Sequence, residues 1–456
     1  MQSYFSRGSL SNLFIIFLLY IPTVLIFYLA FTSDYVPLEK YESIRFVVLL
    51  LFAPIIFKYI IQLSFSPWYS VVEYVRNKKR SKEYAPSVSV IIPAWNEEVG
   101  VVKTVKSVIN TEYPKLQIII ANDGSTDGTH EAVTGFIRSY QLENNSTTTK
   151  AVIDYIKLEN GGKAKAMNAA LKEVKNEITI TVDADSVMDK NAIKNMVKHF
   201  FDPQVASVAG NVAIGNKTNF IGLAQQLEYL YGFYFKRADS LFNAVYIVGG
   251  AAAAYRTDVI RREGGFDEKI ITEDIEISTR LQALGYYVRY APNAVVYTEG
   301  PSDFIGLCRQ RLRWKYGRFL AFYKHRELFF SLRKKHKTYL SFLILPIALF
   351  AEVLLFFEIL LLIIFYSYTF YTNDFIPLAF VITLLTTVII IQIISDPKTR
   401  YHRNLLLLGP IAWLLFYFID LVEYQALIRS IKRFVSKSGL QWQKWNRSGI
   451  SAKLIE

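Results

Sequence analysis

The chain has 456 residues, of which 52% are hydrophobic, and its mean hydropathy of +0.23 is too high for a wholly soluble protein. Its formal net charge of +13 would suit a nucleic-acid-binding protein, but the basic residues cluster beside apolar stretches, where anionic lipid head groups account for them. We therefore expect no nucleic-acid partner. The single cysteine, Cys308, excludes an intramolecular disulfide framework and fits a reducing compartment.

Five stretches of the chain are long and apolar enough to be membrane spans. A span needs roughly 20 apolar residues, and the stretches that meet this condition are 12–31, 46–65, 339–371, 375–395 and 405–428. The basic run "VRNKKRSK" follows the second stretch and "RKKHK" precedes the third, which places both ends of the intervening region in the cytoplasm. We therefore predict a multi-pass plasma-membrane protein, with the lipid bilayer as one partner and a cytoplasmic domain in the middle.

The predicted organisation has five parts. Residues 1–82 hold two transmembrane helices, 83–302 form the cytoplasmic domain, and 303–338 form interfacial amphipathic helices. A second transmembrane region follows at 339–430, and then a basic cytoplasmic tail at 431–456. Three crossings after a cytoplasmic domain would leave this tail outside. Either 339–371 contains an interfacial segment plus a crossing, or two short crossings, or the Gly409-Pro410 stretch is re-entrant.

The middle region alternates apolar strands with helical patterns. Strands are predicted at 87–92, in "LQIIIANDGSTDGT", at 152–158 and at 177–182, and a turn at Pro93 leads from the first strand into a helix. This alternation predicts an α/β fold, with a mainly parallel sheet and helices on both faces. In such sheets ligands bind beyond the carboxyl ends of the strands.

Polar residues follow the first two strands directly. Asn96, Glu97, Asn122 and Asp123 could converge on one crevice at the edge of the sheet. Taken singly, each is equally well explained as a turn residue or a helix cap.

A pair of aspartates strengthens the case for a site. Asp183 and Asp185, in "EITITVDADS", are expected to end an apolar strand two residues apart, and alternate strand residues point to the same side. Their carboxylates would repel each other unless a cation lies nearby. Oxygen ligands of this kind suit Mg²⁺ or Mn²⁺ bound to a nucleotide diphosphate.

Two further segments carry candidate residues. In "ENGGKAKAMNAAL" the glycines let the backbone approach a ligand, and Lys163 or Lys165 could meet a diphosphate, although a glycine turn before a surface helix fits as well. In "ITEDIEISTRL" Glu273 and Asp274 stand at the start of a helix, where the helix dipole stabilises a carboxylate anion. Such an anion could accept a proton from a sugar hydroxyl, although it could also be a cap.

The stretch "LCRQRLRWKYGRF", residues 307–319, precedes the third apolar stretch. A membrane-surface helix accounts for Arg309, Lys315 and Arg318 as side chains that reach lipid phosphates. It does not explain the adjacent guanidinium and indole of Arg313 and Trp314, next to a domain that ends in a nucleotide site.

The ordered set "PAWNEE", "NDGSTDGT", "GGKAKAMNAAL", "TVDADS", "TED" and "QRLRW", flanked by apolar spans, resembles the membrane-integrated, inverting family 2 glycosyltransferases. This group includes cellulose, hyaluronan, chitin-oligosaccharide and poly-N-acetylglucosamine synthases. The resemblance covers about residues 87–318, and "VGGAAAAYR" and "QQLEYLYGFYFKRADSL" are similar to the last two of these synthases. It implies the glycosyltransferase A-type fold.

The resemblance also implies a role for each matched residue. Asp274, with Glu273 beside it, would supply the general base, and the DxD pair would bind the nucleotide and its metal through Asp183 and Asp185. The acceptor sugar would meet Gly249, Gly250, Gln310 and Trp314. The donor UDP-sugar would meet Pro93, Ala94, Asn96, Glu97, Asp123, Lys163, Asp183 and Arg313.

The function implied is processive transfer of a sugar, N-acetylglucosamine by resemblance, from a UDP-sugar to a growing β-linked polysaccharide, with inversion and translocation across the membrane. Accessory secretion subunits are a further expected partner. The alternative is an enzyme that adds one sugar to a lipid carrier, and a third interpretation is a transporter with a nucleotide-sensing domain. Charge is costly in or beside apolar runs, so some of the four acids there are expected to face a polymer channel: Glu352, Glu358, Asp420 and Glu423.

Overall fold

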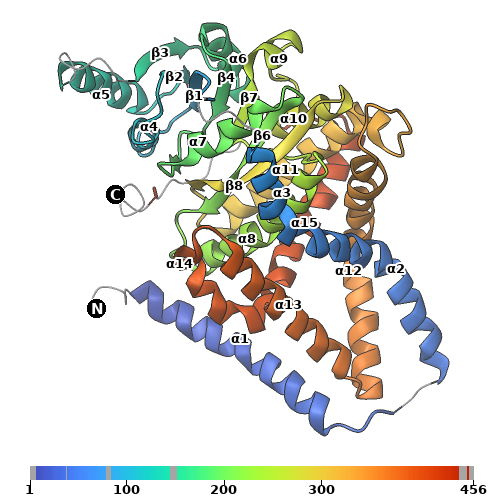
Figure 1. Cartoon of the computed structure of the whole chain (residues 1–456). Coiled ribbons are helices and arrows are strands. Elements are labelled where there is room, and N and C mark those ends of the chain that lie inside the picture. The colour runs from blue at the N-terminus through green and yellow to red at the C-terminus, as the bar shows by residue number, and fades with distance from the viewer. Residues whose placement is uncertain (1–6, 37–38, 79–83, 144–150, 441–448, 451–456) are drawn as a thin grey trace.

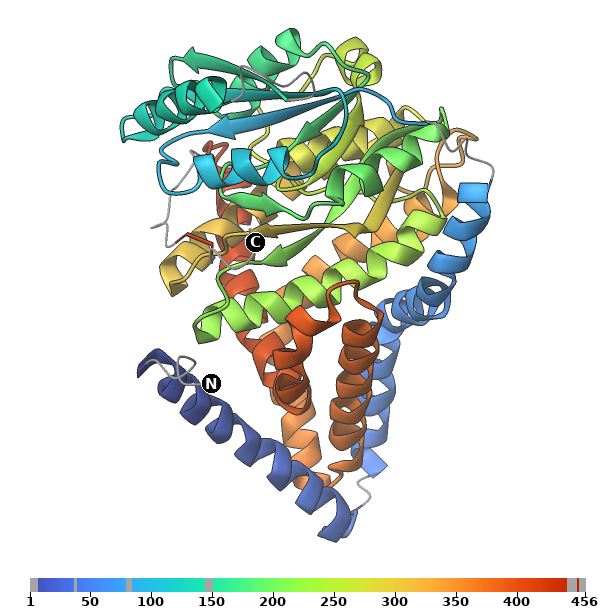
Figure 2. The same ribbon diagram turned by 60° about the vertical axis from the view of Figure 1, so that its left-hand side comes forward.

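The computed structural model describes residues 7–36, 39–78, 84–143, 151–440 and 449–450. An α/β domain built on one sheet sits at one end of a splayed group of long helices (Figure 1; Figure 2). Five helical segments within the described residues are long and apolar enough to cross a membrane. The helices are α1 Arg7–Thr32, α2 Glu39–Phe65, α3 Tyr69–Lys78, α4 Val101–Ile109, α5 Thr129–Glu143, α6 Lys163–Glu173, α7 Ala192–Val197, α8 Phe220–Leu241, α9 Thr257–Arg262, α10 Glu273–Ala283, α11 Phe304–Lys324, α12 Leu345–Thr372, α13 Ile376–Ser395, α14 Thr399–His402 and α15 Ala412–Val435.

The sheet has eight strands in the order β3-β2-β1-β4-β7-β6-β8-β5. The first four are parallel, which confirms the predicted α/β pattern, whereas β7 runs antiparallel to β4 and β6, and β5 runs antiparallel to β8. The strands are β1 Val88–Ala94, β2 Leu116–Asp123, β3 Val152–Leu158, β4 Ile178–Thr181, β5 Ser186–Met188, β6 Val205–Ile214, β7 Ala253–Arg256 and β8 Tyr287–Thr298.

Two strand ends differ from the prediction. Strand β1 continues through Pro93 and Ala94, where a turn was expected, because both stay in parallel register with β2. Strand β4 ends at Thr181, so Asp183 and Asp185 do not alternate along a strand but lie in the turn between β4 and β5. The Ser186 N–H donates to the Asp183 carbonyl oxygen at 3.0 Å and closes this turn. The turn, rather than strand alternation, therefore presents the two carboxylates together.

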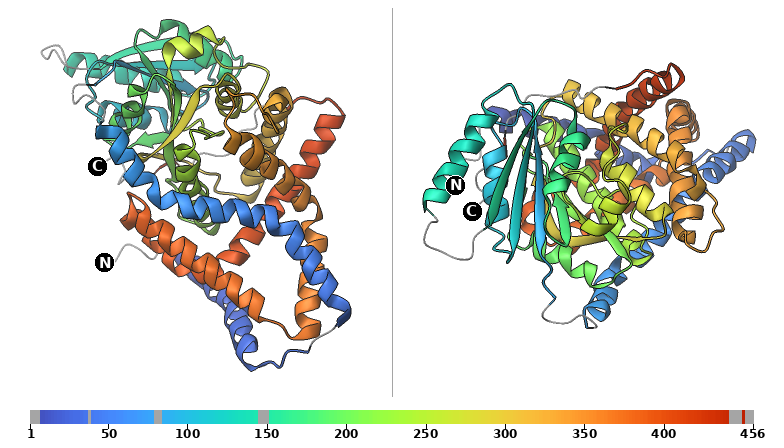
Figure 3. Two further views of the ribbon diagram at one scale, coloured as in Figure 1. Left: turned by 45° about the vertical axis from the view of Figure 1, so that its right-hand side comes forward. Right: turned by 90° about the horizontal axis from the view of Figure 1, so that it is seen from above.

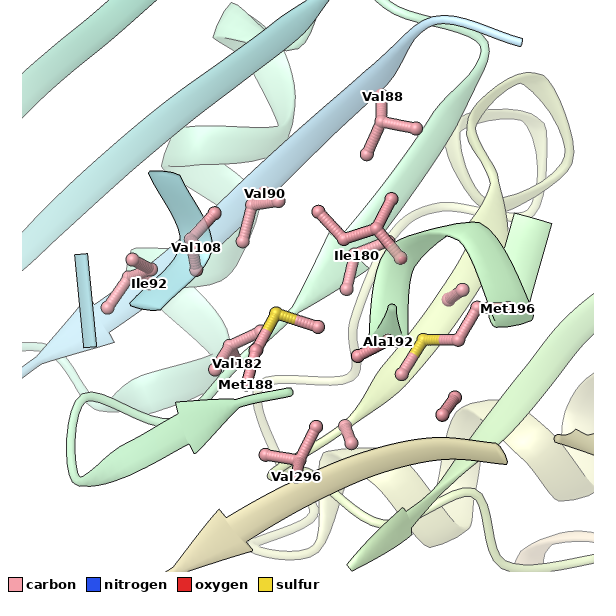
Figure 4. Packing of buried hydrophobic residues seen from close by; sticks show 14 of the residues in the cluster. Val88, Val90, Ile92, Val108, Ile180, Val182, Met188, Ala192, Met196 and Val296 are labelled. Carbon is pink, nitrogen blue, oxygen red and sulfur yellow. The ribbon is translucent and has the colours of Figure 1, made fainter. Parts of the chain in front are cut away.

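Helices cover both faces of the sheet (Figure 3). On one face, apolar residues of α4, α5 and α7 pack against the strands, including Val108 and Met196, which lie beside Val90 and Ile180 in Figure 4. On the other face, α6, α9 and α10 form a second core around Met167. The apolar runs of the central strands are buried on both sides, which is what the sequence pattern requires.

The last long helical segment begins beside the α/β domain and returns to it. At its start, the Gln226 side chain of α8 lies 3.2 Å from the His402 ring. At its end, the rings of Tyr323 in α11 and Phe434 in α15 are 5.7 Å apart. Both ends of the segment Thr399–Val435 therefore lie next to α8 and α11, beside the α/β domain.

The turn of this segment packs against α1. The Tyr20 hydroxyl donates to the Leu407 carbonyl oxygen at 2.5 Å, and Thr23 Oγ1 donates to the Pro410 carbonyl oxygen at 3.2 Å. These contacts satisfy carbonyls that a helix would otherwise pair. Helix α12 forms a single continuous helix through most of the 339–371 run, and a re-entrant Gly409-Pro410 stretch stays a prediction.

Candidate active site

A cavity of about 770 Å³ begins at the carboxyl edge of β1, β2 and β4 and extends between α8 and α11 to the long helices. Its far end is lined by Ala348 of α12 and by Phe416 and Asp420 of α15. Every predicted site residue except Asn96 lines it: Pro93, Ala94, Glu97, Asp123, Lys163, Asp183, Asp185, Gly249, Gly250, Glu273, Asp274, Gln310, Arg313 and Trp314. Residues from seven separate segments of the sequence thus meet at one site.

Asn96 stabilises a turn by hydrogen bonds and does not line the cavity. Its backbone has a φ of 56°, its Oδ1 accepts from the Thr126 N–H at 2.7 Å, and its own N–H donates to Ser125 Oγ at 2.9 Å. The structure thus places Asn96 at the loop after β2 and not in the cavity wall, and donor contact by Asn96 stays a prediction. This is the turn chemistry that the sequence left open as an alternative.

Asp123 fixes the glycine turn that leads into α6. Its two carboxylate oxygens accept from the N–H groups of Gly161 and Gly162 at 2.8 and 2.9 Å. Gly162 has a φ of 97°, which favours glycine, and α6 begins at the next residue, Lys163. Lys163 lines the cavity, whereas Lys165 is exposed outside it.

Lys163 joins the DxD turn to the start of α10. Its Nζ lies 2.7 Å from Asp183 Oδ1 and 2.7 Å from Glu273 Oε1. Burial opposes the charge on this ammonium, but the two carboxylates outweigh burial and hold the pKa of Lys163 above its usual value. A Cβ at Gly250 would lie 2.8 Å from Nζ, so glycine at this position leaves space for the bridging ammonium.

The two acids at the start of α10 are placed differently. Glu273 is buried and paired with Lys163, and burial raises the pKa of its carboxyl despite that partner. Asp274 is only half-buried, and its Oδ1 accepts from the Ile275 N–H at 2.9 Å. Asp274 is therefore the acid whose carboxylate is not tied to Lys163 and is better placed to meet a ligand in the cavity.

Asp185 has the chemistry of a metal ligand. It is buried, and its Oδ1 accepts from Ser186 Oγ at 3.2 Å and from Thr298 Oγ1 at 3.3 Å. Within the described ranges, no three His, Cys, Asp or Glu side chains gather to hold a metal ion. A divalent cation at Asp185 and Asp183 would therefore complete its coordination with ligand oxygens, which suits Mg²⁺ or Mn²⁺.

Helix α11 brings three predicted residues to the cavity. Gln310 is 4% exposed and, within the described part of the chain, its Oε1 accepts no hydrogen bond. A buried hydrogen-bond acceptor without a donor is costly. A sugar hydroxyl in the cavity would donate a hydrogen bond to Oε1. Trp314 extends the cavity wall towards Tyr229, at 6.2 Å between ring centroids.

The prediction that Lys315 and Arg318 reach lipid phosphates is wrong. Lys315 Nζ lies 2.8 Å from Glu352 Oε2 and 2.7 Å from Glu423 Oε2, and Arg318 pairs with Glu352. These glutamates come from α12 and α15, and no local sequence signal shows that they meet α11. Only Arg309 is exposed, as expected of a membrane-surface helix.

Arg311 belongs to the same buried network. It makes two hydrogen bonds with Glu228 of α8, at 2.8 and 2.6 Å, and its guanidinium lies 4.4 Å from the Trp314 ring centroid. The network accounts for two of the four acids considered as channel residues, since Glu352 and Glu423 are ion-paired. Glu423 and Asp420 also line the cavity.

Gly317 lets α11 approach the start of α10. A Cβ at Gly317 would lie 2.8 Å from Thr272 Cβ and closer still to Thr272 Oγ1, and a β-branched side chain has little room to move. We expect Gly317→Ala to lower the free energy of unfolding by about 1–3 kcal/mol, measured by thermal unfolding of the detergent-solubilised protein. Gly135→Ala in α5 is the control, because nothing lies within 4 Å of its Cβ. Equal stability of the two variants would contradict this contact.

The fold and the cavity define a glycosyltransferase of the A-type α/β class. The model described as "Glycosyltransferase like family 2" matches residues 85–317, just over half of the chain, and the chain belongs to this family. The family assignment predicted from the motifs is therefore confirmed.

The comparisons also give similar proteins. A poly-beta-1,6-N-acetyl-D-glucosamine synthase of Staphylococcus epidermidis is 32% identical over 243 residues, which cover 52% of this chain and 56% of that protein. The synthase of the same name from Staphylococcus aureus is 32% identical over 254 residues, 54% of this chain and 58% of that protein. This chain thus matches a little over half the length of these curated relatives.

Among solved structures, a mannosyltransferase of Pyrobaculum calidifontis in complex with GDP-Man and Mn²⁺ is similar, with a TM-score of 0.52 and 20% identity, over 86% of this chain and 99% of that chain. This likeness supports the fold. The expected A-type sheet with apolar helices on both flanks is confirmed.

Proposed function

We propose that this glycosyltransferase transfers N-acetylglucosamine from a UDP-sugar, with anomeric inversion, to the end of a growing β-linked polysaccharide that it moves across the membrane. The observation that carries the proposal is the continuous cavity, which joins the DxD turn to α12 and α15. The names of the two staphylococcal relatives support the sugar. An enzyme that adds only one sugar to a lipid carrier would not require a cavity that continues past the acceptor site to the apolar helices.

In the proposed mechanism the protein binds the UDP-sugar, orients the acceptor and deprotonates the acceptor hydroxyl. Pro93, Ala94, Glu97 and Asp123 line the end of the cavity that takes the uridine, and Arg313 meets the diphosphate, for which its planar donors are suited. A Mg²⁺ or Mn²⁺ ion held by Asp185 and Asp183 would stabilise the charge on the departing UDP.

The acceptor end of the site positions the attacking hydroxyl. Trp314 gives the acceptor sugar a flat apolar face, Gln310 accepts from one of its hydroxyls, and Asp274 takes the proton from the hydroxyl that attacks the anomeric carbon. Gly249 and Gly250 also line the cavity, and at Gly249 nothing lies within 4 Å of an added Cβ, which leaves room for the acceptor sugar. A single in-line displacement inverts the anomeric carbon.

Incubation of the full-length protein in lipid with Mg²⁺ or Mn²⁺ and labelled UDP-sugars tests this function. We expect a high-molecular-weight polymer from UDP-N-acetylglucosamine. A lipid that carries a single sugar would instead support the carrier-loading alternative, and no turnover with any donor would refute a synthase.

Trp314→Ala tests the acceptor role. We expect KM for an added acceptor oligosaccharide to rise by roughly tenfold or more, because a stacked aromatic surface is lost, while Kd for UDP, measured by calorimetry, changes little. Trp68→Ala, at an exposed tryptophan outside the cavity, is the control. A larger loss of UDP affinity than of acceptor affinity would contradict the assignment.

We further propose that the protein lies in the plasma membrane with residues 83–302 in the cytoplasm, followed by the interfacial helices at 303–338. The tail at 431–456 would share that side, because the Tyr316 hydroxyl donates to the Ser438 carbonyl oxygen at 3.2 Å. Residues 441–448 and 451–456 of this tail lie outside the described residues. Accessory secretion subunits stay a prediction.

This topology can be measured by cysteine labelling in a Cys308→Ser background. A membrane-impermeant thiol reagent is expected to label Ser33→Cys, between α1 and α2, in intact cells, because α1 places it at the far end of the bundle. Ser436→Cys, just after α15, is expected to react only after lysis. Labelling of Ser436→Cys in intact cells would place the end of α15 outside the cell. With residues 83–302 in the cytoplasm, that result would exclude a re-entrant Gly409-Pro410 stretch.

A further inference from the structure

Helix α8 presents one continuous face to the cavity. Tyr229, Gly232, Phe233 and Lys236 all line it, and their positions at i, i+3, i+4 and i+7 put them on one side of the helix. The Tyr229 ring centroid lies 6.2 Å from that of Trp314 and 5.9 Å from that of Phe233. The aromatic surface that begins at Trp314 therefore continues along α8, which runs beneath the sheet in Figure 2.

The glycine in the middle of this face is not required by the packing of the protein. Gly232 lies within the helix Phe220–Leu241, where glycine weakens a helix relative to alanine. Nothing in the described structure lies within 4 Å of a Cβ built at Gly232, and its φ is not positive. No neighbour and no backbone conformation explains the missing side chain, so the space it leaves belongs to the cavity.

Lys236 supplies a hydrogen-bond donor at the end of this face. Its Nζ lies 4.0 Å from the Phe233 ring centroid, and among the described residues it forms no ion pair with a carboxylate. Three of the four cations of α11 that line the same cavity, Arg311, Lys315 and Arg318, are paired with glutamates. Burial also lowers the pKa of Lys236 to about 8, which fits a lysine whose partner comes from a ligand.

We infer that Tyr229, Gly232, Phe233 and Lys236 form a second carbohydrate subsite, which holds the acceptor sugar that precedes the one at Trp314. The rings pack against the apolar face of the sugar, Gly232 leaves room for it, and Lys236 donates to a hydroxyl or amide carbonyl oxygen. This inference rests on the proposed function, because it assumes an oligosaccharide acceptor in the cavity.

The test compares acceptors of different lengths. Full-length protein in lipid is given UDP-N-acetylglucosamine and β-1,6-linked N-acetylglucosamine oligomers of one to four sugars. In Gly232→Leu the added side chain would fill the subsite, so we expect the ratio of KM for the tetramer to KM for the monosaccharide to rise at least about tenfold over wild type. Gly135→Leu is the matched control, since it is also a mid-helix glycine with nothing within 4 Å, and it lies outside the cavity.

A second variant tests the subsite by a binding measurement that does not depend on turnover. Lys236→Met keeps the length of the side chain and removes its donors, and we expect tetramer affinity, measured by calorimetry with UDP present, to fall roughly three- to tenfold. An unchanged tetramer-to-monosaccharide ratio in Gly232→Leu, with elongation intact, overturns the subsite alone. Competition by a short-chain phosphatidic acid in place of the tetramer, lost in Lys236→Met, would also overturn it in favour of a lipid-phosphate site. Absence of any elongation by wild type would refute the proposed function itself.

Discussion

Replacing Asp274 with asparagine is expected to lower the rate of sugar transfer by roughly 10²- to 10⁴-fold, the contribution typical of a general base. Asparagine has the same shape and its side-chain oxygen can still accept from the Ile275 N–H, which is 2.9 Å from Asp274 Oδ1. It can no longer take a proton. The neighbouring acid cannot replace it, because Glu273 is buried and bound to Lys163 at 2.7 Å. Single-turnover kinetics with labelled UDP-sugar measure the transfer step, and calorimetry measures UDP binding, which should stay near that of wild type.

Two other variants separate the role of Asp274 from a loss of structure. Asp258→Asn, on the exposed surface of α9, removes a carboxylate outside the cavity and should keep full activity. Glu273→Gln should release Lys163 and so weaken UDP binding as well as transfer. Transfer at the wild-type rate by Asp274→Asn would remove Asp274 from the role of base.

Removal of divalent metal is the second change with a large expected effect. Two carboxylates close together repel, and a cation between or beside them relieves that repulsion. Asp183 is paired with Lys163, and Asp185 accepts hydrogen bonds from Ser186 and Thr298. A divalent cation bound by Asp185 and Asp183 would stabilise the negative charge on the departing diphosphate. We expect chelation with EDTA to abolish transfer, and added Mg²⁺ or Mn²⁺ to restore it.

Asp185→Asn should weaken metal binding by roughly 100-fold or more, because an amide oxygen without charge replaces a carboxylate ligand. Titration of Mn²⁺ followed by electron paramagnetic resonance measures this affinity in the presence of UDP, independently of turnover. Asp258→Asn again serves as the control. Full activity in EDTA, or unchanged Mn²⁺ affinity in Asp185→Asn, would contradict a metal site at the DxD turn.

Local sequence patterns predict most of the fold and most of the residues that line the cavity. The first four parallel strands follow from alternating apolar and helical patterns, and Lys163, Glu273 and Asp274 stand at the helix starts where the patterns put them. The residues of the site were found because each belongs to a short motif at the carboxyl end of a strand or the start of a helix. The differences are local: β4 ends before Asp183, and the side chain of Asn96 binds the loop after β2.

Contacts between distant segments could not be predicted in this way. The sequence predicts that Lys315 and Arg318 reach lipid phosphates, because nothing near them indicates that Glu352 and Glu423 arrive from two other helices. The sequence likewise leaves the direction of the last helical segment open, because its contacts with Tyr20 and Thr23 of α1 join residues that are far apart in the chain.

The sequence by itself thus determined the family, the strands, the apolar helices and the chemical groups of the site. Only the tertiary structure decided that Lys163 bridges Asp183 and Glu273, that the basic face of α11 is buried in ion pairs, and that α8 lines the cavity. The physical reason is that periodicity and turn chemistry act over a few neighbouring residues. The partner of a buried charge, and the space beside a helical glycine, are set by segments that lie tens to hundreds of residues away.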